Sequence, residues 1–159
     1  MKVAVIMGSK SDYPKLEEGI KILKEFGIAV EARVLSAHRT PSELMSFMDE
    51  IQNSVDVIIA AAGKAAHLPG VVASHTLIPV IGLPIKSSTL DGLDSLLSIV
   101  QMPKGIPVAT VTIDSSLNAA LLATQIMSLK YENLKIKLDN YRREMAKKVL
   151  HDDESISNL

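Results

Sequence analysis

The sequence predicts a three-layer α/β fold, in which a five-stranded parallel sheet lies between helices and an extra helix follows at the C-terminus. Five short apolar runs recur along the chain, and helical patterns of apolar residues separate them. Each run is continuous rather than alternating, as expected for a strand whose two faces are both covered in a parallel sheet. Strand and helix therefore alternate five times, which is typical of an open α/β sheet. The runs are residues 3–7, 30–35, 57–62, 80–83 and 108–113.

The helices between these runs are indicated by apolar residues at helical spacing. Leu16, Ile20 and Leu23 share one face, and Gly27 follows at the position where a glycine often ends a helix. Two later segments repeat this spacing, at Leu93, Leu96, Leu97 and Val100 and at Ala119, Leu122, Ala123 and Ile126.

A charged amphipathic helix is predicted at about residues 131–150, after the fifth strand and its helix. Two alternatives stay open for it: it packs on its own domain, or it contacts a neighbouring subunit. We expect the polar tail, 151–159, to be frayed. No repeat or domain boundary interrupts the chain, so we expect one domain, 1–159, with a core of about 2–129. The apolar stripe of the last helix consists of Leu134, Leu138, Tyr141 and Met145.

The composition argues against several classes of protein. The chain has 159 residues, 47% of them hydrophobic, which is enough for a globular core. A net charge of −1 gives no general attraction to nucleic acid or to an acidic membrane. No Cys is present, so disulfides and thiolate metal sites are impossible, which is consistent with a reducing cytoplasm. The N-terminal apolar run is too short for a signal peptide, and no window approaches the roughly 18 apolar residues of a membrane-spanning helix.

Polar side chains follow each predicted strand at its carboxyl end, where open α/β sheets bind their ligands. We therefore expect a polar, anion-accepting pocket at this edge of the sheet. The contributing segments are residues 8–12, 36–39, 63–67, 86–88 and 114–116.

The segment after the second run is the most informative of these. Thr40 suits the N-cap of a helix, Pro41 its first position and Glu43 a capping box, so His38 and Arg39 lie on a tight strand-to-helix turn. A helix N-terminus favours an anion, and a guanidinium beside it is suited to clamping a phosphate. The alternative for Arg39 is a solvated turn residue. His38 is the candidate acid/base, because an imidazole both gives and takes a proton near neutral pH.

The other candidates have simpler structural explanations. Ser9, Ser11 and Asp12 could cap the first helix, and the phosphate loop motif of nucleotide hydrolases is absent. His67 is better explained as a structural histidine than as a site residue on residue type alone. His75 and His151 are expected to be bystanders. Neither a Ser-His-Asp order nor a metal-ligand spacing accompanies His38, so proton transfer without a cofactor is the chemistry that remains.

Five motifs together carry a resemblance to a known family: MGSKSD, SAHRTP, AAHLPG, DSLLSIVQMPKGIPVAT and NAALLA. The chain resembles the class I 5-(carboxyamino)imidazole ribonucleotide mutases of purine biosynthesis, from residue 3 to about residue 129. The resemblance implies a flavodoxin-like α/β fold, a cytoplasmic homo-octamer, and no metal or organic cofactor. It also implies a reaction in which the carbamate of the substrate releases CO2 in a closed pocket. The ring carbon then attacks this CO2 while a histidine handles the proton.

The resemblance also implies roles for individual residues. Asp12 would bind the ribose hydroxyls, Ser9 and Arg39 would hold the phosphate, and His38 would carry the proton. Ser11 and Ser36 belong to the same two loops. A third loop would cover the base and the CO2, and a fourth, 101–103, would approach an adjacent site in the octamer. The residues of the third loop are Gly63, Ala65, His67 and Leu68.

Two residues depart from the family pattern GAGGAAHLPG. Ala61 and Lys64 replace glycines, and Lys64 must either avoid a positive φ or carry strain. We expect the Lys64 ammonium to point outward, as solvated lysines at loop tips usually do.

Three alternatives remain to be separated from the mutase. A non-catalytic module binding a nucleotide or a flavin would leave His38 idle, and of the aromatic residues only Tyr13 lies near the edge loops. An assembly protein would use residues 98–107 and the last helix for subunit contacts alone. Class II relatives carboxylate the aminoimidazole directly with CO2, but their corresponding loop lacks AAHLPG.

Overall fold

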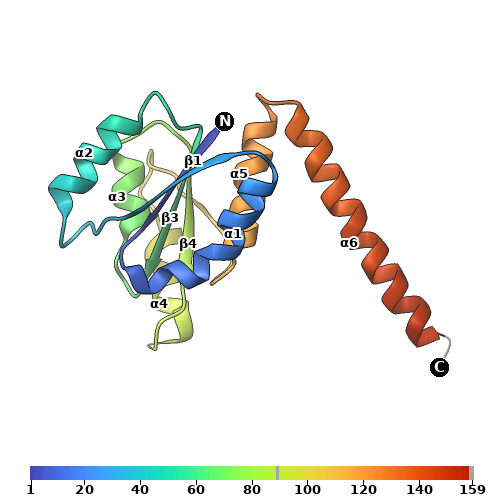
Figure 1. Ribbon diagram of the computed structural model, residues 1–159. Coiled ribbons are helices and arrows are strands. Elements are labelled where there is room, and N and C mark those ends of the chain that lie inside the picture. Colours follow the sequence, from blue (N-terminus) through green and yellow to red (C-terminus); the bar gives the residue numbers. More distant parts are fainter. Residues whose placement is uncertain (89, 158–159) are drawn as a thin grey trace.

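The computed structural model describes residues 1–88 and 90–157, and helices lie on both faces of a central sheet (Figure 1). The strands are β1 (Lys2–Met7), β2 (Ala29–Val34), β3 (Val57–Gly63), β4 (Val80–Ile85) and β5 (Ala109–Thr110). The helices are α1 (Tyr13–Glu25), α2 (Pro41–Ile51), α3 (Leu68–Ser74), α4 (Leu93–Val100), α5 (Ser116–Ser128) and α6 (Asn133–Ser157), with short 3-10 turns at Lys10–Asp12 and Leu90–Gly92.

The sheet has five parallel strands in the order β2-β1-β3-β4-β5, which confirms the predicted fold class. The chain leaves β1 toward β2 and then returns to the other side of β1 with β3. The strand order therefore reverses between β1 and β3, and a crevice opens at the carboxyl ends of strands on either side of such a point.

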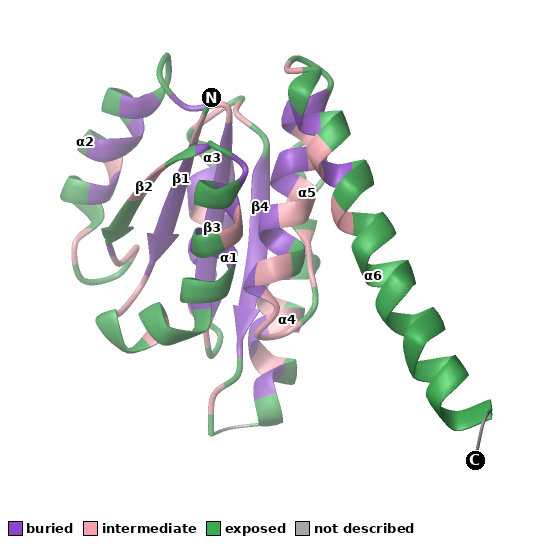
Figure 2. Ribbon diagram, turned by 45° about the vertical axis from the view of Figure 1, so that its right-hand side comes forward, coloured by how far each residue is buried: buried purple, intermediate pink, exposed green. Residues whose placement is uncertain are grey.

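Each face of the sheet has its own hydrophobic core, because successive side chains of a strand point to opposite faces. Val3, Val5 and Met7 of β1 pack with α1, α5 and the start of α6. Ala4 and Ile6 pack with α2, α3 and α4. Figure 2 shows the resulting buried centre, with β1, β3 and β4 almost wholly covered.

The predicted buried face of α1 and its end at Gly27 are confirmed. Leu16, Ile20 and Leu23 are buried on one face of α1. Gly27 has a φ of 76°, and it donates to the carbonyl of Lys24 while Ile28 donates to that of Leu23. These two bonds form a Schellman motif, which needs the left-handed backbone that glycine supplies.

Two predicted strands differ from expectation. β2 is not covered on both faces, because it is the edge of the sheet, and the Val34 side chain is 50% exposed. β5 is far shorter than the predicted 108–113. Pro84 of β4 turns its carbonyl toward this segment and accepts from the Asp114 N–H. Its missing N–H lies on the same side, so the β4–β5 ladder loses a donor there.

The apolar spacing in α4 predicted the helix correctly but not its buried face. Ile99 and Ser95 are buried, whereas Leu93, Leu97 and Val100 are each about half exposed. The Ser95 hydroxyl donates to the carbonyls of Ile85 and Gly92, which explains how a polar side chain is tolerated there. The three exposed side chains face away from the rest of this chain.

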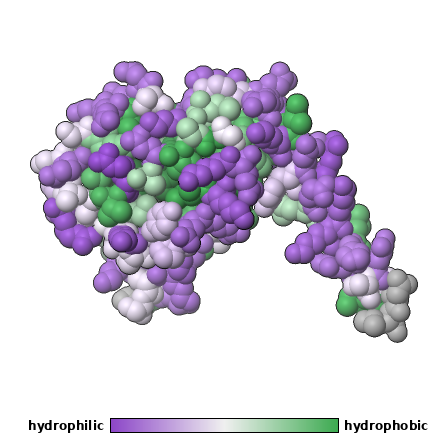
Figure 3. All heavy atoms as spheres, viewed as in Figure 1, coloured by the Kyte–Doolittle hydropathy of each residue, from purple (hydrophilic) through white to green (hydrophobic). Residues whose placement is uncertain are grey.

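α6 divides into a packed half and an exposed half. Leu134 and Leu138 are buried, and Tyr141 meets the Phe26 ring edge to face, so the first half packs on its own domain. Every residue of 142–157 is exposed, and α6 projects from the body with mostly hydrophilic side chains (Figures 1 and 3). Contact with a neighbouring subunit stays a prediction for this half.

The predicted frayed tail is wrong for residues 151–157, which continue α6. No Gly or Pro stands there to end the helix, and polarity alone does not end one. Exposed ion pairs between Arg143 and Asp139 and between Lys147 and Glu144 support the helix just before this segment. Residues 158–159 lie outside the described part of the chain. Within the described ranges, no helix is long and apolar enough to cross a membrane.

Asp56 joins the start of β1 to the segment between α5 and α6. Its carboxylate accepts hydrogen bonds from the Lys2 N–H (3.0 Å), the Lys130 ammonium (2.9 Å) and the Tyr131 hydroxyl (3.0 Å). Burial alone would raise the pKa of Asp56, but the bonds from Lys130, Lys2 and Tyr131 outweigh it and lower the pKa below its usual 3.8. Asp56 therefore holds the α5–α6 junction against the start of the sheet.

Candidate active site

A cavity of about 750 Å³ opens at the carboxyl ends of the strands, next to the point where the strand order reverses. Nine of the ten predicted site residues line it. They are Ser9, Ser11, Asp12, Ser36, His38, Arg39, Gly63, Ala65 and Leu68. Nine further residues complete the lining, most of them in the predicted loop segments but not among the predicted site residues. They are Gly8, Ala37, Ala62, Lys64, Ala66, Ile85, Lys86, Ser87 and Ser88.

The loop after β1 places three polar side chains on the cavity. Ser9 accepts from the Ser11 N–H (3.3 Å) and hydroxyl (2.8 Å), and Asp12 accepts from the Ser9 N–H (3.1 Å). This is the capping arrangement that the simpler explanation predicts, but it caps the 3-10 turn ahead of α1 rather than α1 itself. The capping bonds hold the same side chains against the cavity, so the two explanations do not exclude each other.

The Asp12 carboxyl is partly buried in this loop. Burial raises the pKa of Asp12, although the hydrogen bonds from Ser9 and Ser11 and the charge of Arg39 act in the opposite direction. An ionised Asp12 is therefore short of favourable contacts. Hydroxyl donors of a ligand would supply them, as the sugar of a nucleotide does.

The loop after β2 is held by the Ser36 side chain. Its Oγ accepts from the backbone N–H of His38 (3.4 Å) and of Arg39 (3.2 Å) and from the Arg39 Nε (3.4 Å). The Arg39 Nη2 donates to the Gly8 carbonyl at 2.6 Å, which joins this loop to the loop after β1. The guanidinium is thus positioned by the protein rather than freely solvated, with N–H groups left to donate to a ligand.

Helix α2 begins at Pro41 as predicted, but its capping differs from the prediction. The Thr40 side chain makes no capping bond, and its Oγ1 accepts from the Ser36 N–H instead (2.9 Å). The N-terminus of α2 therefore has no side-chain cap. The Thr40 hydroxyl instead stabilises the turn that carries His38 and Arg39.

His38 is exposed at the cavity, and its imidazole makes no hydrogen bond to any part of the chain that the structure describes. Both ring nitrogens are therefore available to a ligand. A histidine with no protein partner, beside a positioned arginine, is suited to proton transfer on a bound anion.

His67 is the predicted site residue that does not line the cavity. Its Nδ1 lies 2.5 Å from the Ser98 carbonyl of α4, and its ring lies against Gly70, where an added Cβ would overlap it. The residue also has a left-handed backbone, with a φ of 50°. This arrangement favours the structural interpretation, in which His67 fixes the loop between β3 and α3.

The fifth predicted segment, 114–116, does not line the cavity either. Asp114 accepts from the Lys15 ammonium (2.6 Å) and from the Lys86 N–H (2.9 Å). The Ser116 hydroxyl accepts from the Gly19 N–H, between α5 and α1. The polar groups of this segment therefore stabilise neighbouring elements instead of facing the cavity. The segment follows β5, which lies one strand beyond the cavity.

Comparisons with known proteins show the family of this chain. The sequence profile of the family described as AIR carboxylase matches residues 2–148. The chain belongs to the AIR carboxylase family. It is 57% identical to the N5-carboxyaminoimidazole ribonucleotide mutase of Saccharolobus solfataricus, over 94% of this chain and 95% of that protein. It is 56% identical to the mutase of the same name from Methanocaldococcus jannaschii, over 99% and 98%. A crystal structure of Treponema denticola PurE superposes with a TM-score of 0.89 at 32% identity, covering 97% of each chain.

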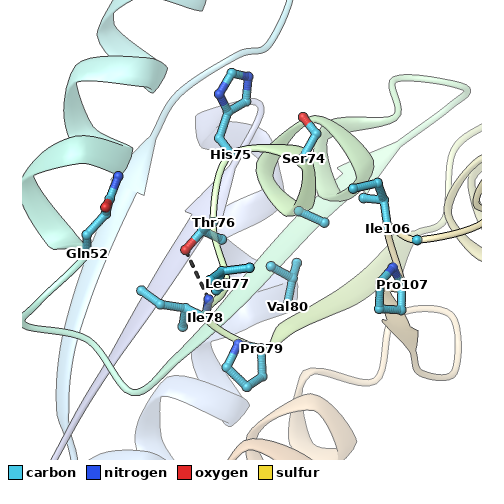
Figure 4. A pocket seen from close by; sticks show the side chains of 12 residues that line it. Gln52, Ser74, His75, Thr76, Leu77, Ile78, Pro79, Val80, Ile106 and Pro107 are labelled. Carbon is cyan, nitrogen blue, oxygen red and sulfur yellow. Dashed lines mark hydrogen bonds between the residues drawn. The ribbon is translucent and has the colours of Figure 1, made fainter.

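A second cavity of about 450 Å³ lies at the opposite edge of this AIR carboxylase family member, where β4 begins. Its lining is apolar apart from a few neutral groups and His75. Figure 4 shows the His75 imidazole pointing away from Leu77 and Ile78, while the Thr76 hydroxyl accepts from the Ile78 N–H. The concentration of ionisable groups at the larger cavity identifies that one as the candidate active site. Within the described residues, no cluster of His, Asp and Glu could hold a metal ion.

Proposed function

We propose that this chain is an N5-carboxyaminoimidazole ribonucleotide mutase, acting as one catalytic domain in de novo purine biosynthesis. The observation that carries the proposal is the turn after β2, where the His38 ring, with no hydrogen-bond partner among residues 1–88 and 90–157, lies beside an Arg39 that bonds to the loop after β1. The names of relatives at 56–57% identity over most of both chains support the same reaction.

In this proposal the substrate phosphate binds Arg39 and Ser9, and Asp12 accepts from the ribose hydroxyls. Arg39 suits the phosphate because a guanidinium donates two parallel hydrogen bonds to it. With the phosphate at that end, the imidazole lies toward the loop between β3 and α3. Gly63, Ala65 and Leu68 of this loop offer small or apolar contacts to the flat ring.

The chemical step moves a carboxyl group from nitrogen to carbon. The N–C bond of the carbamate breaks, CO2 leaves, and His38 delivers a proton to the exocyclic nitrogen. The ring carbon then attacks the CO2, a C–C bond forms, and His38 takes the proton that the ring carbon loses. Atoms and charge balance without a cofactor, and retaining CO2 in a closed pocket replaces a bimolecular encounter.

The proposal includes assembly into a homo-octamer in the cytoplasm. The half-exposed Leu93, Leu97 and Val100 of α4 support assembly, because single chains rarely leave a contiguous apolar patch uncovered. Exposed apolar side chains that stand among the charged residues of α6 add to this, namely Met145, Val149, Leu150 and Ile156. Sizing with light scattering tests this part, and a monomer would contradict it.

The activity is tested by incubating the protein with the carbamate-bearing ribonucleotide, without bicarbonate, and following the carboxylated imidazole by absorbance. We expect conversion by the wild type and loss of about 100-fold or more in kcat for His38→Asn. Arg39→Ala should raise KM about 10- to 100-fold, as for the loss of charged hydrogen bonds to phosphate. The matched control is His75→Asn at the opposite edge, which should retain wild-type rates.

Two results would favour other functions. Turnover of the bare aminoimidazole ribonucleotide with added CO2, and not of the carbamate, would indicate the direct carboxylase. Binding of the ribonucleotide without turnover in either assay would indicate a non-catalytic module.

A further inference from the structure

Lys64 has an unusual backbone for its residue type. It follows the last residue of β3, lines the larger cavity and has a φ of 57°. This left-handed conformation is disfavoured for any residue with a Cβ except in special contexts, and a glycine would adopt it freely. Strained residues persist where the surrounding structure holds them in place, and they cluster at ligand sites.

The Lys64 ammonium has no ion-pair partner among the residues that the structure describes. Three cationic side chains line the cavity. Arg39 donates to the Gly8 carbonyl, and the Lys86 ammonium pairs with Asp91 at 2.6 Å. Lys64 makes no hydrogen bond or ion pair with the residues that the structure describes, whereas its two counterparts do. Its ammonium is therefore available to an anion in the cavity.

The strand order determines which part of a ribonucleotide Lys64 can reach. Arg39 and Ser9 follow β2 and β1, whereas Lys64 follows β3 on the other side of β1. The phosphate and the base lie at opposite ends of the ribose. A phosphate on the Arg39 side therefore directs the imidazole, with its carboxylate, toward Lys64.

We propose that Lys64 binds the carboxylate of the ribonucleotide, as the carbamate of the substrate and as the ring carboxylate of the product. This inference rests on the proposed function and names the group of the substrate that Lys64 recognises. Lys64 then distinguishes carboxylated ribonucleotides from the bare aminoimidazole ribonucleotide. The outward, solvated ammonium stays a prediction for the free protein, and the proposed contact forms when ligand binds.

The test compares two ligands that differ in one group. Binding of 4-carboxy-5-aminoimidazole ribonucleotide and of 5-aminoimidazole ribonucleotide is measured by titration calorimetry. Lys64→Gln removes the charge and keeps a polar side chain, which is one bond shorter. We expect it to weaken binding of the carboxylated ligand about three- to tenfold, as for an exposed ion pair, and to leave the other ligand within about twofold. Lys64→Arg should retain the preference.

Controls keep the result interpretable. Lys64→Gly relaxes the left-handed backbone, so it folds without strain and should show the same loss of discrimination as Lys64→Gln. Lys21→Gln removes an exposed charge from α1, away from the cavity, and should change neither affinity. Raising the salt concentration should reduce the wild-type preference for the carboxylated ligand.

The outcomes separate this inference from the proposed function. Equal weakening of both ligands by Lys64→Gln would assign Lys64 to the phosphate and overturn the inference. Unchanged binding of both ligands would overturn it as well, while an active wild type would leave the mutase proposal standing. A wild type that binds neither ribonucleotide would overturn both.

Discussion

Gly70→Ala is expected to disturb the loop between β3 and α3, because the new Cβ would overlap the His67 ring. Overpacking of this kind costs about 1–3 kcal/mol. Displacing the ring also breaks its hydrogen bond to the Ser98 carbonyl, worth about 1 kcal/mol. The higher helix propensity of Ala offsets about 1 kcal/mol of this destabilisation, since Gly70 lies in α3. The net expectation is a loss of about 1–3 kcal/mol of stability.

A double-mutant cycle isolates this contact. In His67→Ala the ring is absent, so Gly70→Ala meets no obstacle and should be neutral or stabilising by up to about 1 kcal/mol. The two substitutions should therefore be coupled by about 2 kcal/mol. Urea unfolding of the four proteins, followed by far-UV circular dichroism at one fixed protein concentration, measures the cycle.

The reasoning would be refuted by an equal loss for Gly70→Ala in both backgrounds. That result would mean that the His67 ring is not what excludes a side chain at position 70. A milder result, in which Gly70→Ala lowers mutase activity but not stability, would mean that the loop adjusts by moving the cavity wall instead.

Two further predictions concern the stability of the fold. Asp56→Asn should lower the free energy of unfolding by about 1–2 kcal/mol at pH 7, because three donors lose a charged acceptor. Since the folded pKa of Asp56 lies below 3.8, its contribution is present above that pH and is lost as the pH falls through the folded pKa. The difference between wild type and variant should vanish there in pH-dependent urea titrations, and a constant difference would contradict the prediction. Gly19→Ala would overlap the Ser116 carbonyl, which cannot rotate away, and should cost about 2–3 kcal/mol. Gly8→Ala meets no atom within 4 Å and should change the melting temperature little, so equal melting temperatures for the two variants would refute the close α1–α5 contact.

Most of the sheet was predictable because local sequence determines it. Residues 3–7, 57–62 and 80–83 are continuous apolar runs, and they became the fully covered strands β1, β3 and β4. Such strands are buried on both faces wherever they lie in the centre of a sheet. The loops at their carboxyl ends followed from the same topology, so nine predicted site residues meet at one cavity.

The sequence predictions fail where contacts with another element of the fold determine burial or length. The burial of β2 depends on its place at the edge, and the length of β5 depends on Pro84 in the adjacent strand. The buried face of α4 could not be read from its leucines, because Ser95 finds carbonyl partners in the interior. The chemical role of His67 stays a prediction from the resemblance, and its contact with Ser98 was not visible in the sequence.

By itself the sequence determined the α/β class, the order of the elements, and the loops that carry His38, Arg39 and Asp12. These features depend on the spacing of apolar residues and on turn residues, which act over a few positions of the chain. The tertiary structure alone decided that Arg39 reaches Gly8, that His67 turns to α4, and that Lys64 at the cavity has no ion-pair partner in the described part of the chain. Those contacts join segments far apart in the chain, and the sheet brings them together only after strands from both sides of β1 have paired.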